Sequence, residues 1–304
     1  MSKSNSKHSS GASHRLDIGR GDFLKRAGAV GVGLAGLPLL CAKPNAGKRR
    51  TVFITGSSSG LGFLSGKLLV EQGHKVVLHA RNEAKAKRTK AKLPGVRAVV
   101  VGDVSTLAGM RSVAKQVNAL GTYDAVIHNV GLGTRHPRRE TVDGVTQLFA
   151  VNTLTPYVLT ALMKPSERLI YLSSGLHKNG DASLRDLQWK NRPYNAFQAY
   201  SDTKLHDLLL TLWLARKRPR AFVNAVHPGW VPTKMGGPNA TDDLLKGAQT
   251  QAWLAVSDDS AARVSGKYWF HKKPRSMHSR ANEVAVQDKL IAYLEKISGL
   301  SIKV

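Results

Sequence analysis

The stretch TVFITGSSSGLG, residues 51–62, decides the fold. Its first part, residues 51–55, is a short β-rich run, and the glycine-rich turn after it leads into residues 61–72, whose apolar side chains recur at helical spacing. Glycine lets the backbone turn tightly and come close to an anion, and the N-terminus of the helix offers free N–H groups. The stretch therefore predicts a strand–turn–helix unit that binds a phosphate group.

The same order of strand and helix repeats along the rest of the chain. Near-continuous apolar strands that alternate with helices indicate a parallel sheet covered on both faces. We therefore predict an α/β fold for residues 47–304, a single doubly wound Rossmann domain with a seven-stranded parallel sheet and a ligand site at the carboxyl ends of the strands. The predicted strands are 51–55, 75–80, 96–101, 123–128, 168–172, 221–226 and 267–270, and the predicted helices are 61–72, 83–92, 106–120, 144–163, 195–216, 241–256 and 283–296.

The first 46 residues have a different character. Residues 1–15 are rich in Ser, Lys and His without an apolar period, which is typical of disorder. The apolar run 27–40 is too short to span a bilayer, but it follows a basic flank as an export signal does. The segment 20–25, RGDFLK, resembles a twin-arginine signal with Gly21 in place of the second arginine. We predict a leader outside the fold that exports the chain or associates with a membrane. A short membrane-associated helix or an organellar presequence is the alternative, and without such a signal the protein is cytoplasmic.

Charge and cysteine content limit the other classes of function. The chain of 304 residues has a net charge of +26, a field that attracts nucleotides, acidic membranes and nucleic acid. The basic residues are scattered rather than interleaved with aromatic ones, and no DNA-reading motif occurs, which argues against nucleic-acid binding as the main role. Cys41 is the only cysteine, which excludes an intrachain disulfide, and the eleven histidines lack metal-ligand spacing. We predict no metal site.

The end of the second strand indicates which dinucleotide the turn binds. In NAD-selective folds an acidic residue at this point holds the ribose hydroxyls. Here the strand ends in HARN, residues 79–82, so Arg81 can pair with a 2′-phosphate and no carboxylate repels it. We therefore predict NADP(H) in preference to NAD(H). Asp103, after the third strand, is expected to accept a hydrogen bond from the adenine amino group or to cap the helix that begins near Ser105.

Tyr200 and Lys204 form a pair suited to proton transfer. Four residues apart on a helix, they share a face. A free tyrosine has a pKa near ~10 and is a poor base at neutral pH, but a neighbouring ammonium favours the phenolate. The pair can therefore move a proton on and off an alcohol or carbonyl oxygen.

Taken in order, these residues resemble the short-chain dehydrogenase/reductase superfamily over about residues 50–275. The segment 186–189, DLQW, and the residues around Tyr200 and Lys204 are most similar to its retinol-dehydrogenase-like branch and to daunorubicin C-13 ketoreductase-like proteins. His128 and Val130 depart from the family's NNAG motif. The matching motifs are the glycine turn 55–62, His128–Gly131, Asn152, the serine strand Ile170–Ser174, Tyr200 with Lys204, and His227–Thr233.

The resemblance implies a role for each matching residue. Tyr200 would be the general acid and base, Ser174 would hydrogen-bond the same oxygen, Lys204 would hold the nicotinamide ribose, and Asn152 would support a water-mediated proton relay. His177 follows Ser174 and would either line the substrate side or be a loop histidine. The implied cofactor-binding residues are Gly56, Ser58, Ser59, Gly60, Leu61, Gly62, Arg81, Asp103, Val104, Asn129, Gly131, Tyr200, Lys204, Pro228, Gly229, Val231 and Thr233.

The resemblance also implies a substrate lid at about residues 232–257, and Trp230 and Met235 beside it indicate a lipophilic substrate. We therefore predict an NADP(H)-dependent oxidoreductase that reduces a carbonyl or oxidises an alcohol. Family members pair through the helices that carry Asn152 and Tyr200, which implies a homodimer or homotetramer. One alternative is a sensor or scaffold that binds NADP(H) without turnover, and another is an anion or nucleic-acid binder driven by the net charge.

Overall fold

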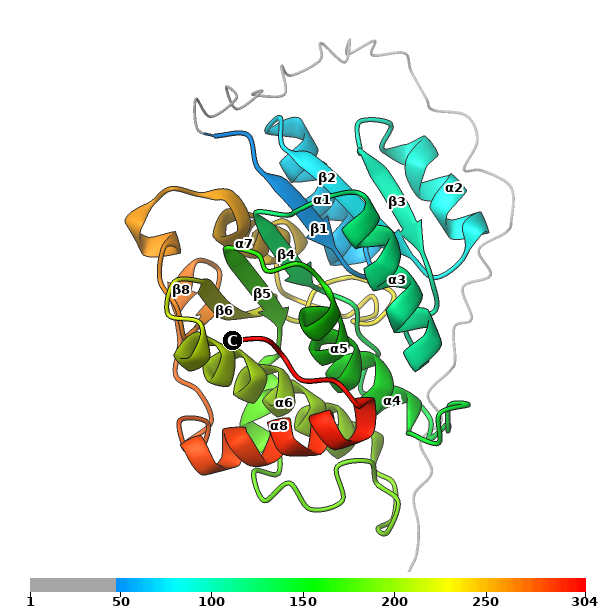
Figure 1. The fold of residues 1–304 in the computed structure, drawn as a ribbon, viewed down its shortest axis with the longest axis vertical. Helices are drawn as coiled ribbons and strands as arrows, with labels where there is room; N and C mark the ends of the chain where they lie inside the picture. Colours follow the sequence, from blue (N-terminus) through cyan, green and yellow to red (C-terminus); the bar gives the residue numbers. More distant parts are fainter. Residues whose placement is uncertain (1–47) are drawn as a thin grey trace, which may run out of the picture. The chain divides into compact units, whose positions relative to one another are not determined.

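The computed structural model describes residues 48–304, and within them one sheet forms the centre of the fold (Figure 1). Its strands follow the order β3-β2-β1-β4-β5-β6-β7-β8, and the first seven of these are parallel. They are β1 Thr51–Ile54, β2 Lys75–Ala80, β3 Ala98–Val101, β4 Ala125–His128, β5 Arg168–Leu172, β6 Phe222–His227, β7 Lys267–Phe270 and β8 Lys273–Pro274.

The seven predicted parallel strands are confirmed, and the eighth was missed. Strand β8 is two residues long and pairs antiparallel with β7. The turn before it, His271–Lys272, has positive φ angles of 49° and 60° at two residues that are not glycine. A Lys-Pro pair after such a turn has no strand pattern in the sequence, because neither the alternation nor the turn residues that mark a hairpin are present.

Helices cover both faces of the sheet (Figure 1). On one face α1 packs against α7, and on the other α3 packs against α5 while α6 lies along β5 and β6. Neighbouring residues of β1 serve the two sides, since Phe53 belongs to one apolar core and Ile54 to the other. The helices are α1 Gly60–Glu71, α2 Glu83–Lys92, α3 Leu107–Ala119, α4 Gln147–Phe149, α5 Thr155–Leu162, α6 Ala196–Lys217, α7 Leu244–Val256 and α8 Val284–Ser298, with a π-helical turn η1 Ala150–Leu154 and 3₁₀ turns η2 Gly175–Asn179 and η3 Ser260–Ala262.

The helix predicted over 144–163 is present from Gln147 to Leu162, but it starts later than predicted and contains a π-helical turn. The segment forms α4, the π-helical turn η1 and α5 in succession. Pro156 is the physical reason, because it has no N–H to bond the carbonyl of Asn152 as an α-helix requires. Turns of this kind inside helices are frequent at functional sites.

The C-terminal helix α8 covers the helix that carries Tyr200. It packs on α6, and residues 199–214 of α6 are all buried within the single chain. Tyr293 of α8 accepts a hydrogen bond from Gln188 at 2.7 Å, and Asp288 pairs with Arg216 at 2.6 Å. The homodimer or homotetramer that the resemblance implies, through the helices that carry Asn152 and Tyr200, stays a prediction.

The predicted leader, residues 1–46 with the apolar run 27–40, lies outside the described residues. Within residues 48–304, no helix combines the length and the apolar character needed to cross a membrane.

Candidate active site

The glycine-rich turn between β1 and α1 is packed so closely that side chains do not fit. Gly56 and Gly60 have φ angles of 61° and 60°, which glycine adopts without strain. A methyl group on Gly56 would lie 2.7 Å from the Cα of Val130, and one on Gly62 would lie 2.4 Å from Nδ2 of Asn129. The turn therefore lies directly against the end of β4.

The N-terminus of α1 is suited to an anion. The side chain of Ser59, its N-cap residue, makes no capping hydrogen bond, and no acidic residue occurs in the first turn. The N–H groups of that turn can therefore bind a negatively charged group such as a pyrophosphate. Leu61, the second residue of α1, packs against Gly247 of α7: a methyl group added to Gly247 would lie 3.2 Å from Cδ2 of Leu61.

Thr55 and His79, which are not among the predicted cofactor-binding residues, hold this turn in place. Oγ1 of Thr55 accepts the N–H groups of Asn129 and Val130 at 2.9 and 3.0 Å. Nδ1 of His79 accepts the N–H of Gly56 at 3.0 Å, so its proton is on Nε2, which lies 2.9 Å from the carbonyl oxygen of Gly102. Burial lowers the pKa of His79, with the bond to Gly102 opposing that effect. His79 is therefore a neutral link between the glycine turn and the end of β3.

Arg81 lies in a group of cations beyond β2. Partial desolvation and the charges of Arg81, Lys234 and Arg88 lower the pKa of Lys85, and Asp103 opposes them. Both Arg81 and Lys234 are exposed. The segment after β2 thus presents several positive charges at one rim of the site.

Asp103 and Val104 follow β3 directly. Oδ1 of Asp103 accepts the N–H of Ser105 at 3.0 Å, while the N-cap of α3 is Thr106, which accepts from Gly109. The capping role considered for Asp103 therefore belongs to Thr106. Val104 is buried, and its carbonyl accepts a hydrogen bond from Thr155 at 2.7 Å.

Asn152 joins the loop after β4 to the region of Lys204. Its Oδ1 accepts the N–H of Leu132 at 2.7 Å, and its Nδ2 donates to the carbonyl of Leu132 at 3.0 Å. A methyl group on Gly131 would lie 3.6 Å from Oδ1 of Asn152 and 3.8 Å from Nζ of Lys204. Three predicted residues thus meet at one point.

The two serines at the end of β5 have different surroundings. Ser173 is buried, and its hydroxyl donates to the carbonyl of Lys204 at 2.8 Å. Ser174 is half-buried, and its Oγ accepts the N–H of Leu176 at 3.2 Å. Within residues 48–304 no acceptor takes the hydroxyl hydrogen of Ser174, so this serine can donate to a ligand.

His177 fixes the backbone of Ser174. Its Nε2 accepts the N–H of His278 at 3.1 Å, so Nδ1 carries the hydrogen and donates to the carbonyl of Ser174 at 2.6 Å. The ring is fully buried and packs edge-on against Tyr268. Burial lowers its pKa, with the bond to Ser174 opposing the shift. His177 is therefore a buried structural link and not a histidine on the substrate side.

Tyr200 and Lys204 lie together on α6 as their spacing predicts. Nζ of Lys204 is 5.7 Å from the centroid of the Tyr200 ring. It donates to the carbonyl of Leu172 at 2.7 Å and to the carboxylate of Asp207 at 2.8 Å. Burial alone would lower the pKa of Lys204, but the negative charges of Asp207 and Tyr200 raise it above its ordinary value. Lys204 is thus held as an ammonium beside the phenol.

The segment after β6 lies over the glycine turn. Gly229 has a φ of 98°, and a methyl group there would lie 2.7 Å from Cβ of Asp242. The carboxylate of Asp242 also accepts a hydrogen bond from the N–H of Trp230. A methyl group on Gly60 would lie 3.6 Å from Cγ2 of Thr233. The predicted residues Pro228, Gly229, Val231 and Thr233 therefore share one segment that approaches the turn.

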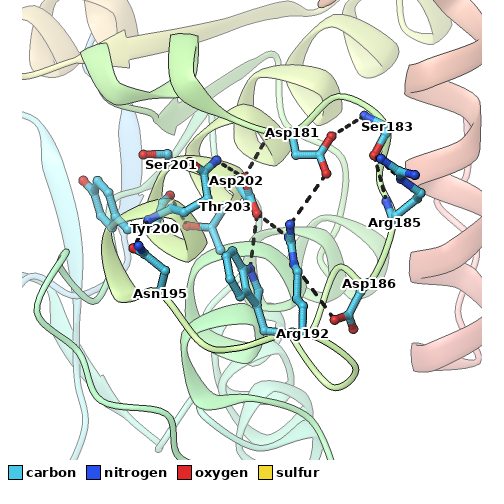
Figure 2. A network of polar contacts seen from close by, with 12 residues as sticks. Asp181, Ser183, Arg185, Asp186, Arg192, Asn195, Tyr200, Ser201, Asp202 and Thr203 are labelled. Atoms are coloured by element: carbon cyan, nitrogen blue, oxygen red, sulfur yellow. Dashed lines mark hydrogen bonds and ion pairs between the residues drawn. The ribbon is translucent and has the colours of Figure 1, made fainter.

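A loop at residues 181–195 folds onto α6 beside Tyr200 (Figure 2). Arg192 pairs with Asp202 at 2.9 Å and lies over the Trp189 ring, 3.6 Å from its centroid. Nε1 of Trp189 donates to the same carboxylate at 3.2 Å. Trp189 has a positive φ of 56°, which the surrounding contacts maintain. The loop presents apolar surface to Tyr200, in a cluster with Leu148, Trp189 and Ala199 and the half-buried Leu132, Leu176 and Tyr194.

The family model described as short chain dehydrogenase matches residues 50–184. An uncharacterized oxidoreductase of Emericella nidulans is 41% identical over 256 residues, which cover 83% of this chain and 98% of that relative. The chain is a short-chain dehydrogenase/reductase.

Other comparisons agree with this family. Retinol dehydrogenase 14 of Homo sapiens is 31% identical over 83% of this chain and 87% of its own length. The solved structure of an uncharacterized protein from Mycobacterium paratuberculosis is 27% identical, with a TM-score of 0.75 over 87% of this chain and 98% of that one. This short-chain dehydrogenase/reductase is therefore an oxidoreductase with retinol-dehydrogenase relatives, and its family uses a nicotinamide cofactor. No cluster of three or more metal-ligating side chains occurs in residues 48–304.

Proposed function

We propose that this protein transfers hydride between NADP(H) and a carbonyl or alcohol of a lipophilic small molecule, with Tyr200 as the general acid and base. The observation that carries the proposal is that Asn152 and Lys204 meet beside Gly131, with the Tyr200 ring next to Lys204. When bound, the nicotinamide supplies or accepts the hydride. The protein residues then have to orient the substrate and handle one proton.

The proton is handled at the Tyr200 oxygen. In reduction Tyr200 donates its proton to the carbonyl oxygen, and in oxidation the phenolate removes it from the alcohol. The free hydroxyl hydrogen of Ser174 suits a bond to the same oxygen, where it would stabilise developing negative charge. The Lys204 ammonium favours the phenolate. Asn152, whose side chain lies by Gly131 near Lys204, would support a water in the relay.

One feature of the site, a group of cations, supports the choice of NADP(H) over NAD(H). The cations Arg81, Lys85, Arg88 and Lys234 gather at the rim beyond β2, and Asp103 is the carboxylate that opposes them. A 2′-phosphate would relieve this repulsion through charge-assisted hydrogen bonds. The free first-turn N–H groups of α1 suit the pyrophosphate that both dinucleotides share.

The surroundings of Tyr200 support a lipophilic substrate. The apolar cluster of Leu132, Leu148, Leu176, Trp189 and Tyr194 lines its ring side. Trp230, just before the predicted lid, and Met235, within it, are exposed at 52% and 54%. Apolar walls with a few polar groups at the reacting atom are typical of small-molecule sites.

The test is a titration of the full chain with NADPH and NADH, followed by NADPH oxidation with aromatic ketones, quinones and retinal. We expect tighter binding of NADPH, and turnover that Tyr200→Phe abolishes while cofactor binding is retained. Tyr200→Phe removes only the hydroxyl, so its ring still fills the apolar cluster. Turnover that survives this change would refute the assignment of Tyr200, and NADPH binding without turnover on any carbonyl would favour a sensor.

A further inference from the structure

Asp207 is a buried carboxylate that none of the predicted site residues explains. It lies three residues after Lys204 on α6, and its side chain is 4% exposed. Its Oδ2 accepts a hydrogen bond from Nζ of Lys204 at 2.8 Å. A carboxylate is unfavourable in a protein interior unless it is paired, so the two side chains depend on each other.

The contacts of Lys204 come from two different elements. The carbonyl of Leu172, at the end of β5, and the carboxylate of Asp207 on α6 each accept one of its hydrogen bonds. An ammonium has three N–H donors, so one remains for a ligand. A flexible lysine held from the strand and from its own helix has a fixed Nζ position, next to Gly131 and the Tyr200 ring.

Few other ionisable groups face this pair. Tyr200 on α6 contributes to the pKa of Lys204, and Tyr171 on β5 is the neighbour whose pKa Asp207 helps to raise, after the larger effect of burial. Tyr171 also hydrogen-bonds Thr160 at 2.7 Å and stays neutral. The turn η1, which packs on α6, carries no ionisable residue. Within residues 48–304, Lys204 is the one charge that acts on the pKa of Asp207.

The net charge of the pair therefore contributes to the electrostatic field at Tyr200. When Asp207 is ionised, its negative charge balances the ammonium. When it is neutral, the positive charge of Lys204 is unbalanced. Burial raises the pKa of Asp207 to about 6, with Lys204 opposing the shift, so both states lie near the working range.

We infer that Asp207 is a positioning residue that fixes the Lys204 ammonium and sets how strongly it favours the Tyr200 phenolate. The inference rests on the proposed function of Tyr200 and Lys204. Asp207 holds no proton of the substrate and need not touch the cofactor. It acts only through Lys204.

The test is the pH dependence of alcohol oxidation in full-length Asp207→Asn. Asparagine keeps the shape and one acceptor oxygen for Lys204, but it removes the negative charge. Oxidation needs the phenolate, so kcat/KM for the alcohol rises with pH to a plateau. Without the balancing carboxylate the phenolate is more stable, and the midpoint of this rise should move to lower pH by roughly one unit.

Asp288→Asn is the matched control. It removes a carboxylate of α8 that pairs at 2.6 Å with Arg216, which lies on α6 as Lys204 does. Arg216 lies twelve residues after Lys204, about 18 Å along α6. The same chemical change there should leave the midpoint of the pH profile in place.

Asp207→Glu gives an independent readout of positioning. It keeps the charge, but the longer side chain cannot keep the 2.8 Å contact unless Nζ moves, so kcat should fall without a shift of the midpoint. An Asp207→Asn midpoint that is unchanged or moves to higher pH would overturn the inference, as would an Asp207→Glu protein with unchanged kcat. A wild-type protein without any Tyr200-dependent turnover would instead refute the proposed function.

Discussion

Acid should destabilise this protein through histidines that are buried in the neutral form. Burial lowers the pKa of His128 and His206 to about 3 and that of His227 to about 4. In the unfolded chain a histidine has a pKa near ~6.5. Between these values the unfolded state binds a proton that the folded state does not. The fold therefore keeps its full stability above about pH 7 and loses it as the pH drops below ~6.5.

The expected loss is large. At pH 5, each of the three histidines removes roughly 2 kcal/mol from the free energy of unfolding. Asp207 acts in the opposite direction, because its pKa is raised to about 6 and the folded state binds the proton more tightly. Acidification from pH 7.5 to 5 therefore adds about 1 kcal/mol to the free energy of unfolding through Asp207. The net loss is on the order of 5 kcal/mol, comparable to the whole stability of many domains.

Urea unfolding of the wild type and of His128→Asn at pH 7.5 and 5.0 measures one histidine's share. His128 stacks on Tyr171 with ring centroids 4.6 Å apart, so the variant should be less stable at pH 7.5. Its loss between pH 7.5 and 5.0 should nevertheless be smaller than that of the wild type by roughly 2 kcal/mol. An equal loss in both proteins would refute the reasoning, because it would mean that His128 takes up its proton as readily in the native state as in the unfolded chain.

Three further predictions concern the site. Gly62→Ala places a methyl group 2.4 Å from Nδ2 of Asn129, so NADPH affinity in a fluorescence titration should fall at least about tenfold, and unchanged affinity would contradict the packing described. Arg81→Asp should reverse the ratio of kcat/KM between NADPH and NADH, since a carboxylate repels the 2′-phosphate. Arg192→Met leaves the Asp202 carboxylate without its ion pair, which should lower stability by about 2 kcal/mol and raise the KM of the substrate, as thermal melting and steady-state kinetics would measure.

The strands and most helices were predictable because their patterns are local. Runs such as residues 75–80 and 168–172 are mostly apolar, as buried parallel strands are, and the structure gives these strands the same bounds. The helix predicted over 144–163 includes a π-helical turn before Pro156, which the apolar pattern does not reveal because it depends on the N–H that proline lacks. Strand β8 has no pattern of its own, since it forms only by pairing with β7.

The site was predictable where it depends on motifs and not where it depends on long-range contacts. The spacing of Tyr200 and Lys204 predicts their contact, because α6 is one continuous helix. His79 bonds the glycine turn across 23 residues of sequence, and Arg192 acts through a loop fold that no local pattern encodes. Asp207 could have been found, since an acid three residues after a lysine shares its helix face.

The most direct test of the central claim is the transfer of deuterium from NADPH labelled at C4 to a carbonyl substrate, followed by mass spectrometry of the alcohol. The account predicts that the wild type places one deuterium on the alcohol carbon, and that Tyr200→Phe, with cofactor still bound, forms no labelled product at neutral pH. Labelled alcohol at the wild-type rate from Tyr200→Phe would contradict the account.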